Sequence, residues 1–217
     1  MANKMNDLEV QFIEALTFHI PFDGWSEASM VAAAQDCNMS MKEVTALFPK
    51  GMDDVISAAN ALNDRKMIAH FMEKFGDEFD SMPVHLRIRE LIIARLEIFA
   101  GQKEVIRKTM SHMAQPKQAG LGSKLLYRSL DAMWRTAGDR STDFNFYTKR
   151  ASLGAVYGAT LLAFLADESP DMAQTKAFLD RRLKDVAKIP KVSKPVKKVA
   201  DKAFDMLRRI LPQSRAS

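Results

Sequence analysis

The run of residues 151–166, ASLGAVYGATLLAFLA, contains no charged side chain. It is shorter than the roughly 20 apolar residues that an α-helix needs to cross a bilayer. A helix that is apolar on all sides must instead be covered by other parts of the protein. The run therefore predicts an all-helical bundle built around one central, buried helix.

The rest of the chain also has the spacing of apolar residues that is typical of helices, and no segment alternates like a strand. Ser26 and Ser40 are expected to cap helices, with Glu43 completing a capping box. We predict breaks at PFDGW (residues 21–25) and QPKQAGLG (115–122), with a helix opening at Ser123. The expected organisation is a helix-turn-helix-like part over 1–75, a helical part over 83–186, a linker over 187–194 and a last helix over 195–211.

The charge of the chain is unevenly distributed. The net charge is +5, but residues 184–217 hold ten Lys or Arg and three Asp, which leaves the remaining chain mildly acidic. A basic tail of this kind needs an anionic partner, either nucleic acid or membrane lipid. Cys37 is the only cysteine, so no intrachain disulfide can form and a reducing compartment fits.

Two short capped helices joined by a four-residue turn, followed by a long helix, follow the order of a helix-turn-helix. This half resembles tetracycline-repressor-like regulators, whose second motif helix needs side chains for phosphates and base edges. Here that helix, SMKEVTALF, offers only Lys42, and Glu43 neutralises it locally. We expect the architecture without DNA reading and no nucleic-acid partner. A ligand-responsive transcriptional regulator is the alternative function.

Gly154 and Gly158 lie four residues apart on one face of the central helix, and each costs roughly 1 kcal/mol relative to Ala. Either another backbone packs closely there or space is left for a ligand. Apolar side chains of the same helix and of the preceding one could line such a space. The candidate lipid-binding residues are Leu130, Met133, Trp134, Gly154, Tyr157, Gly158, Leu161 and Phe164.

The segment PVKKVADKAFDMLRRILP near the end of the chain has apolar residues on one helical face and cations on the flanks. This pattern is typical of a helix that lies in a membrane interface, where the cations meet anionic lipid. A last helix packed on the bundle or a dimer arm are the alternatives. The candidate membrane residues are Lys197, Lys198, Phe204, Leu207, Arg208, Arg209, Ile210 and Leu211.

The sequence contains no recognisable catalytic or metal-binding pattern. The four histidines are scattered, and no Glu-x-x-His motif of carboxylate-bridged di-iron bundles occurs. No phosphate-binding loop, dinucleotide fingerprint or zinc spacing is present either. We therefore expect a protein that is not an enzyme and that has no metal or cofactor.

Three aromatic residues lie close together in GDRSTDFNFYTKR, residues 138–150. Phe144 and Tyr147 are three residues apart, so they share a helix face, which we expect to point toward the core. Phe146 lies about 200° around the helix from Phe144 and is predicted to be exposed beside the Lys149–Arg150 pair.

The same segment carries the resemblance to a known family. Trp134, a Gly-Asp pair, Ser-x-Asp-x-Asn, an aromatic pair and Tyr-Thr-Lys-Arg precede the apolar helix, and Ser169-Pro170-Asp171 follows it. This order resembles the signature region of the ubiquinone biosynthesis accessory protein family, the ninth of the coenzyme Q genes. The resemblance is specific over this region and loose over the N-terminal half.

The resemblance implies a tetracycline-repressor-like all-helical fold, usually dimeric, that binds isoprenoid quinone intermediates or other lipid. It also implies a partner, a di-iron hydroxylase, and a membrane contact through the tail. The docking surface would include Asp143, Asn145, Phe146, Tyr147, Lys149 and Arg150. Phe146 stands where mitochondrial members have Trp, which loses the indole donor. Because the start of the sequence does not resemble a transit peptide, we expect a bacterial protein at the cytoplasmic face of the inner membrane.

Overall fold

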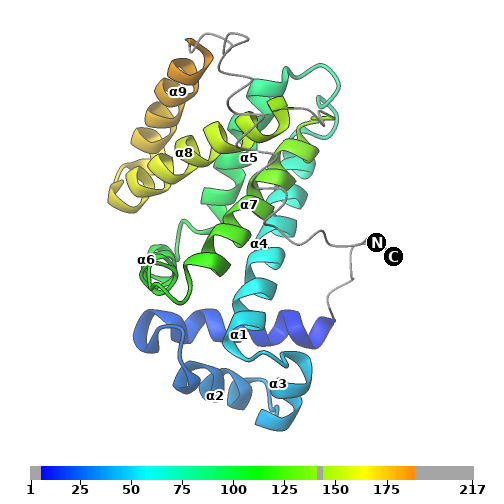
Figure 1. The fold of residues 1–217 in the computed structure, drawn as a ribbon, viewed down its shortest axis with the longest axis vertical. Helices are drawn as coiled ribbons and strands as arrows, with labels where there is room; N and C mark the ends of the chain where they lie inside the picture. Colours follow the sequence, from blue (N-terminus) through cyan, green and yellow to red (C-terminus); the bar gives the residue numbers. More distant parts are fainter. Residues whose placement is uncertain (1–5, 141–143, 189–217) are drawn as a thin grey trace.

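The computed structural model describes residues 6–140 and 144–188 of the chain. Within these ranges all regular structure is helical, which confirms the predicted all-α class (Figure 1). The helices are α1 (Asp7–Asp23), α2 (Glu27–Asp36), α3 (Met41–Leu47), α4 (Met52–Phe75), α5 (Val84–Ile98), α6 (Lys103–Met113), α7 (Ala119–Thr136), α8 (Phe144–Ala166), the 3-10 helix η1 (Pro170–Met172) and α9 (Ala173–Lys188).

Helices α1, α2 and α3 form one end of the molecule (Figure 1). Their apolar faces meet in an N-terminal cluster that includes Phe12, Leu16 and Phe48. The predicted capping box at Ser40 is present, since its hydroxyl accepts from the Glu43 amide while the Glu43 carboxylate accepts from the Ser40 amide at 2.7 Å. Reciprocal bonds of this kind satisfy backbone donors that a helix start leaves free.

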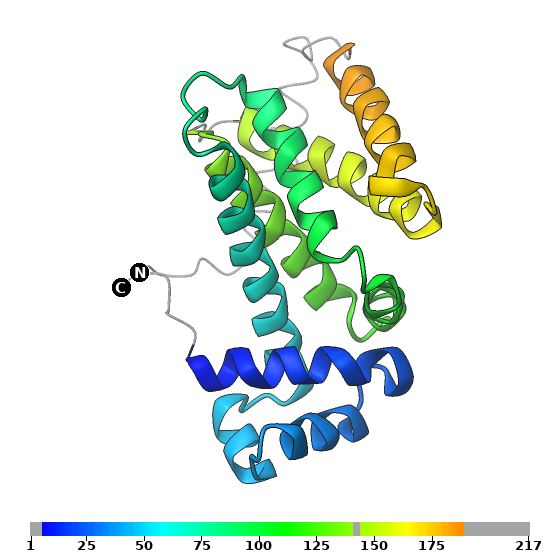
Figure 2. The same ribbon diagram turned by 180° about the vertical axis from the view of Figure 1, so that it is seen from behind.

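The long helix α4 joins the two halves of the molecule, as the view from behind also shows (Figure 2). Its first half contributes Val55 and Leu62 to the N-terminal cluster. Its second half contributes Met67 and Phe71 to a C-terminal cluster, in which α5, α7, α8 and α9 also take part. The two clusters are therefore built on one continuous helix.

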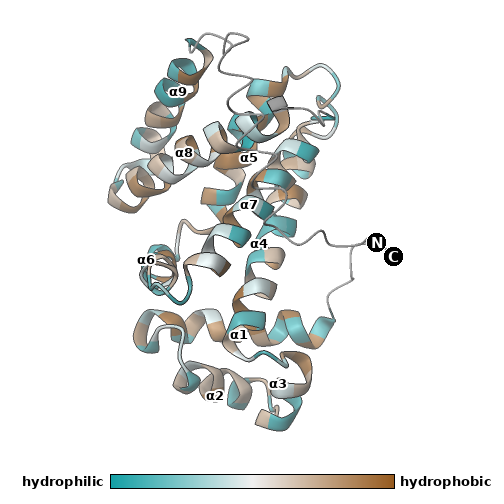
Figure 3. Ribbon diagram, viewed as in Figure 1, coloured by the Kyte–Doolittle hydropathy of each residue, from teal (hydrophilic) through white to brown (hydrophobic). Residues whose placement is uncertain are grey.

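Helix α8 has little hydrophilic colour along its middle (Figure 3) and buries Leu153, Val156 and Phe164 in the C-terminal cluster. It packs mainly against α7 and α9. However, Leu162 is largely exposed, so the helix is not covered on every side as the uncharged run predicted. The run is apolar enough for a central helix, but within the described residues only part of its surface has neighbours.

Two predicted helix boundaries are wrong. Helix α1 continues through Pro21 and ends only at Gly24, whose φ of 65° stops it. Helix α7 begins at Ala119 rather than at Ser123, so two glycines that indicated a loop lie inside a helix. An added Cβ at Gly122 would lie 3.2 Å from the Cβ of Met113, so the close approach of α6 explains this glycine.

Candidate functional site

A cavity of about 780 Å³ lies where the N-terminal helix meets the C-terminal helices. Helices α1, α4, α5, α6 and α7 form its walls, and α8 adds Tyr157 and Leu161. Its volume is within the range of roughly 300–1,000 Å³ found for small-molecule sites. Much of the wall is aliphatic, for example Ile13, Ile56, Leu62, Ile98, Ile106 and Leu125. Such a space suits an apolar ligand.

The cavity opens beside α1. Two apolar side chains of its wall are strongly exposed, Phe18 at 72% and Leu126 at 41%. The ion pair between Lys66 Nζ and Glu14 Oε1, at 2.8 Å, also belongs to the wall and is half-exposed. These residues form the mouth of the cavity.

The buried, inner part of the cavity wall contains a polar group centred on Arg95 of α5, which is only 4% exposed. Its Nε donates to the Tyr157 hydroxyl at 3.1 Å, its Nη1 to Asp64, and its Nη2 to Asn60 Oδ1 at 3.0 Å. Asn60 Nδ2 in turn donates to Asp64 Oδ2 and to Ser129 Oγ, both at 3.2 Å. We call these five residues the Arg95 cluster.

The Arg95 cluster carries a balanced pair of charges. Burial alone would lower the pKa of the Arg95 guanidinium, but Tyr157 and the Asp64 carboxylate raise it, so Arg95 stays charged. This cluster was not predicted from the sequence. A signal was present, because Arg95 interrupts the apolar face of α5, and a buried arginine requires a counter-ion.

The candidate lipid-binding residues divide into two groups. Tyr157 and Leu161 line the cavity. Leu130, Met133 and Phe164 belong to the C-terminal cluster and Trp134 packs against it, and none of these four lines the cavity.

The two glycines of α8 also lie outside the cavity wall. An added Cβ at Gly154 would lie 3.1 Å from Leu130 Cδ1, so close packing of α7 accounts for this residue. An added Cβ at Gly158 would have no neighbouring atom within 4 Å. The structure gives no packing reason for glycine at position 158.

A second polar cluster joins the end of α7 to the start of α8. Arg150 is 3% exposed, and its guanidinium contacts Asp131 Oδ1 at 2.6 Å and Asp139 Oδ2 at 3.3 Å. Lys149 Nζ lies 2.6 Å from Asp139 Oδ1 and 5.4 Å from the centre of the Trp134 ring. We call this the Arg150 cluster.

Arg150, which the sequence places in the docking surface, has a buried side chain that is bonded to two carboxylates. The prediction for the aromatic residues also changes. Tyr147 is 41% exposed rather than turned into the core. Phe146 is only partly exposed, because Arg150 Cζ lies 3.3 Å from the centre of its ring and Tyr147 meets it edge-on at 4.9 Å.

Asp167 organises the turn between α8 and α9. Its Oδ1 accepts from the amide and hydroxyl of Ser169, and its Oδ2 accepts from the amide and hydroxyl of Thr175. Burial by itself would raise the pKa of this carboxyl, but the hydrogen bonds from Ser169 and Thr175 outweigh burial and hold the pKa far below its usual range. Asp167 therefore caps the first turn of α9, to which Thr175 belongs.

The second motif helix, α3, exposes Lys42, Glu43, Thr45 and Ala46. The Glu43 carboxylate has a lowered pKa because the side chain and backbone of Ser40 donate hydrogen bonds to it. The exposed face therefore presents one cation beside one anion. This agrees with the expectation that α3 is poorly suited to DNA phosphates.

Several predicted site residues lie outside what the structure describes. These are Asp143, the side chain of Asn145, and the whole set of membrane residues in 195–211. The predicted homodimer stays a prediction. Among the described residues, no group of three or more His, Cys, Asp or Glu is arranged to hold a metal ion. None of the described helices has the length and apolar character to span a membrane.

A family model matches one segment of the chain, and the limits of that segment coincide with helix boundaries. The family model of COQ9 matches residues 119–190, which begin with α7 and end just beyond α9. The chain is a relative of COQ9. The match includes the Arg150 cluster and the Asp167 turn, and it confirms the resemblance drawn from the sequence motifs.

Curated COQ9 proteins extend the similarity over most of the chain. The ubiquinone biosynthesis protein COQ9 of Rattus norvegicus, a mitochondrial protein, is 28% identical over 86% of this chain and 61% of its own length. The Homo sapiens protein is 26% identical over 89% of this chain and 62% of its own length. That of Schizosaccharomyces pombe is 27% identical over 83% of this chain and 70% of its own length. The chain thus spans about three fifths of the animal COQ9 proteins that it matches.

A solved structure supports the predicted fold. The TetR transcriptional regulator from Nitrosomonas europaea superimposes with a TM-score of 0.67, covering 84% of this chain and 99% of the regulator at 20% identity. This likeness shows the fold alone. The fold of this COQ9 relative is therefore TetR-like and all-helical, as the helix-turn-helix order predicted.

Proposed function

We propose that this protein is a non-catalytic lipid-binding component of ubiquinone biosynthesis. It holds an isoprenoid quinone intermediate in the cavity and presents it to a membrane-associated di-iron hydroxylase. The observation that carries the proposal is the cavity of about 780 Å³, with aliphatic walls, an exposed mouth and one polar end, in a relative of COQ9.

The shape of the cavity supports an elongated amphiphile as its ligand. Aliphatic side chains from α1, α4, α5, α6 and α7 provide a surface on which an isoprenoid tail would bury its area. Met110 and Met113 add flexible side chains that adapt to an irregular ligand. The polar inner end provides hydrogen-bonding groups, which a purely hydrocarbon ligand would leave without partners.

The surface near the start of α8 supports a protein contact. Tyr147 is exposed there, and Phe146 lies against it. Tyr127 of α7 is exposed to a similar degree and lies one helical turn before Asp131, which contacts Arg150 of α8. Aromatic residues that share a surface are favoured as anchors in protein interfaces. Within the proposed docking surface, Tyr147 takes the role that the sequence assigned to Phe146.

The membrane contact in this proposal rests on the sequence of the tail. The amphipathic pattern over 195–211 would bring the protein to the membrane that holds both the lipid and the hydroxylase. The protein itself supplies no oxidation chemistry in this scheme, and the reaction is left to the partner.

The direct test of ligand binding is mass spectrometry of lipids extracted from the natively purified protein. We expect an isoprenoid quinone or a precursor of it. In Ala59→Leu the added side chain would enter the cavity, because Ala59 is part of its wall. This variant should lose the lipid, while Ala155→Leu, which adds the same volume at an exposed position of α8, should retain it. The absence of any lipid from the wild-type protein would refute the proposal.

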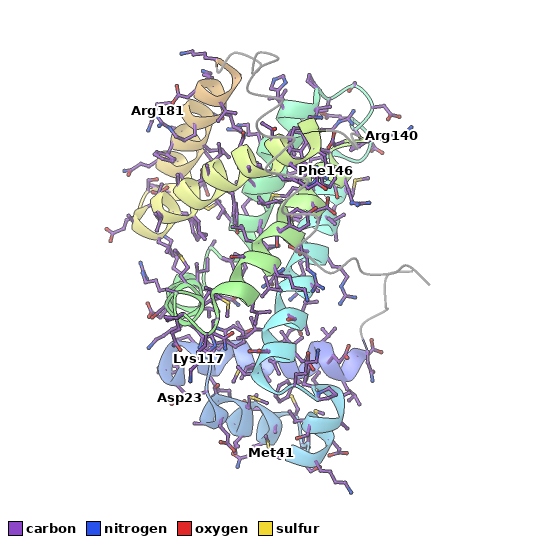
Figure 4. All side chains as sticks on the ribbon, viewed as in Figure 1. Asp23, Met41, Lys117, Arg140, Phe146 and Arg181 are labelled. Carbon is purple, nitrogen blue, oxygen red and sulfur yellow. The ribbon has the colours of Figure 1, made fainter. Side chains whose placement is uncertain are left out.

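The partner is tested by affinity capture from the native cells with membranes included. We expect a di-iron hydroxylase in the bound fraction of the wild type and its loss in Tyr147→Ala. The matched control is Phe22→Ala, which removes an even more exposed aromatic at the end of α1. Asp23 marks that end in Figure 4, far from Phe146 at the start of α8. Equal capture by both variants would refute the assigned surface.

The transcriptional regulator remains the competing function. It predicts salt-sensitive binding to a short palindrome, which would need a cationic reading helix. The single cation on the exposed face of α3 stands beside the ionised Glu43. A mobility-shift assay with fragments from around its own gene should therefore show no specific complex.

A further inference from the structure

The Tyr157 hydroxyl is a polarised hydrogen-bond donor at the inner end of the cavity. Tyr157 is 7% exposed and belongs to the cavity wall. Its oxygen accepts a hydrogen bond from Arg95 Nε at 3.1 Å, and no acceptor for its own proton is found among the described residues. A phenol has one proton to donate, and a buried donor without an acceptor is costly. The hydroxyl can therefore donate its proton in a hydrogen bond to an acceptor on a ligand.

Ser129 provides a second polar group beside it. Its hydroxyl oxygen accepts from Asn60 Nδ2 at 3.2 Å and lies 3.4 Å from Asn60 Oδ1. Asn60 is itself held by Arg95 and Asp64. The polar groups at this end are thus fixed in place by bonds among themselves before any ligand enters. Fixed donors bind a ligand with less loss of entropy than mobile ones.

The charge at this end determines which head groups it favours. The Arg95 guanidinium contacts the Asp64 carboxylate directly, so one positive charge is already matched by one negative charge. A fatty-acid carboxylate or a lipid phosphate would bring a second, unmatched negative charge into a buried site, which is expensive. A neutral head group with a carbonyl or phenol oxygen carries no such penalty.

Exposure gives the direction of the ligand. The polar residues Arg95 and Tyr157 are buried, whereas Phe18 and Leu126 of the same cavity wall are exposed at the mouth. An amphiphile with its oxygen-bearing end at Tyr157 would therefore extend its apolar tail along the aliphatic wall toward Phe18.

We propose that the Arg95 cluster is the head-group site of the cavity. It selects a neutral, oxygen-bearing ring, and the Tyr157 hydroxyl donates a hydrogen bond to a carbonyl or phenol oxygen of that ring. Arg95 positions and polarises the hydroxyl, and Asp64 keeps the site electrically neutral. This inference rests on the proposed lipid-binding function and deepens it by naming the head group and its orientation.

The test compares a ligand that has the head group with one that lacks it. Decylubiquinone carries a neutral quinone ring, and decylbenzene carries the same tail on a ring without oxygen. Dissociation constants are measured with the full chain by displacement of a fluorescent hydrophobic probe. In Tyr157→Phe we expect affinity for decylubiquinone to fall about five- to tenfold, the effect of one hydrogen bond, while affinity for decylbenzene stays within about twofold.

A second variant tests the effect of charge at this end of the cavity. Asp64→Asn keeps an oxygen for Arg95 but removes the matching charge. We expect this variant to bind myristate more tightly than the wild type does, and to lose the preference for decylubiquinone over myristate. Myristate binding that is unchanged in Asp64→Asn would overturn the claim that neutrality sets the selection.

The third test is an infrared measurement on the wild-type protein. A hydrogen bond from Tyr157 should lower the stretching frequency of one carbonyl of bound, isotope-labelled decylubiquinone in the infrared difference spectrum, and the other carbonyl should not shift. Absence of that shift, or an equal loss of affinity for decylubiquinone and decylbenzene in Tyr157→Phe, would overturn the head-group assignment alone. A wild-type protein that binds neither ligand would instead refute the proposed function as a whole.

Discussion

Two arginines are buried in the described part of the chain, and their surroundings are very different. Arg150 contacts two carboxylates, those of Asp131 and Asp139, and the Phe146 ring covers it at 3.3 Å. Arg95 contacts one carboxylate and two neutral oxygens, and its neighbour Tyr157 lines a cavity. The difference indicates that the Arg150 cluster holds α7 against α8, whereas the Arg95 cluster is open to a ligand. Burial of a charge alone does not distinguish a structural site from a binding site.

The largest expected effect is that of Arg150→Met. Removing Arg150 takes a cationic partner away from Asp139, whose side chain is 4% exposed. Breaking a buried ion pair in this way costs about 3–5 kcal/mol. The free energy of unfolding, measured with denaturant, should fall by that amount.

The matched control is Arg135→Met, which removes an exposed arginine bonded to the same Asp131. Exposed pairs contribute at most about 1 kcal/mol. If both variants lost the same stability, the Arg150 cluster would not be what holds α7 against α8.

A smaller loss is expected from Arg95→Met. It also leaves a carboxylate, Asp64, without its partner. However, the Asp64 side chain is 13% exposed, compared with 4% for Asp139, so water reaches its carboxylate more readily. We expect a loss of about 2–3 kcal/mol by the same unfolding measurement, together with loss of decylubiquinone binding. A loss as large as that of Arg150→Met would show that water reaches the Arg95 cluster no more readily than the Arg150 cluster.

Asp167→Asn tests a third kind of buried charge, one stabilised by hydrogen bonds from Ser169 and Thr175. The variant should lose about 1–2 kcal/mol at pH 7, because an amide cannot accept all four bonds. Since the pKa of Asp167 is lower in the folded protein, its contribution is present above the unfolded pKa of about 3.9 and is lost as the pH falls below it.

Unfolding measured at pH 7 and pH 3 should therefore show a weaker acid dependence in Asp167→Asn than in the wild type. The control is Glu168→Gln, which changes the neighbouring, exposed carboxyl. An acid dependence that is unchanged by Asp167→Asn would contradict the assignment.

The smallest expected effects come from replacing the two glycines of α8. Gly154 lies between Arg150 and Tyr157 in the sequence, and Gly158 directly follows Tyr157. Gly158→Ala should stabilise the protein by up to about 1 kcal/mol, because alanine favours the helix and nothing lies near the added Cβ. Gly154→Ala should gain less, because Leu130 must move. Thermal unfolding of the two variants compares them, and a larger gain at Gly154 would contradict the difference in packing.

Much of the fold could be predicted from the sequence. The capping residues Ser26 and Ser40, the long helix α4 and the apolar helix α8 follow from local spacing. The errors have tertiary causes. The glycines at the start of α7 suggested a loop because nothing in the sequence shows that Met113 packs against Gly122.

The candidate site could be predicted only in part. Tyr157 and Leu161 were identified as cavity residues from their place on α8, and both line the cavity. Asn60, Asp64 and Arg95 were missed because they come from α4 and α5, distant in sequence from α8. Spacing along one helix shows on which side of the helix a residue lies, but it does not indicate which other helix packs against that side.

The helices, their order, the uncharged centre of α8 and the motif that relates the chain to COQ9 can all be found in the amino-acid sequence. Which arginine is closed off and which one faces a cavity depends on how the helices pack. The physical reason is that a buried charge must find its compensating partner through packing. Asp131 and Asp139 reach Arg150 only when α7 lies against α8, and Asp64 and Tyr157 reach Arg95 only when α4 and α8 both meet α5.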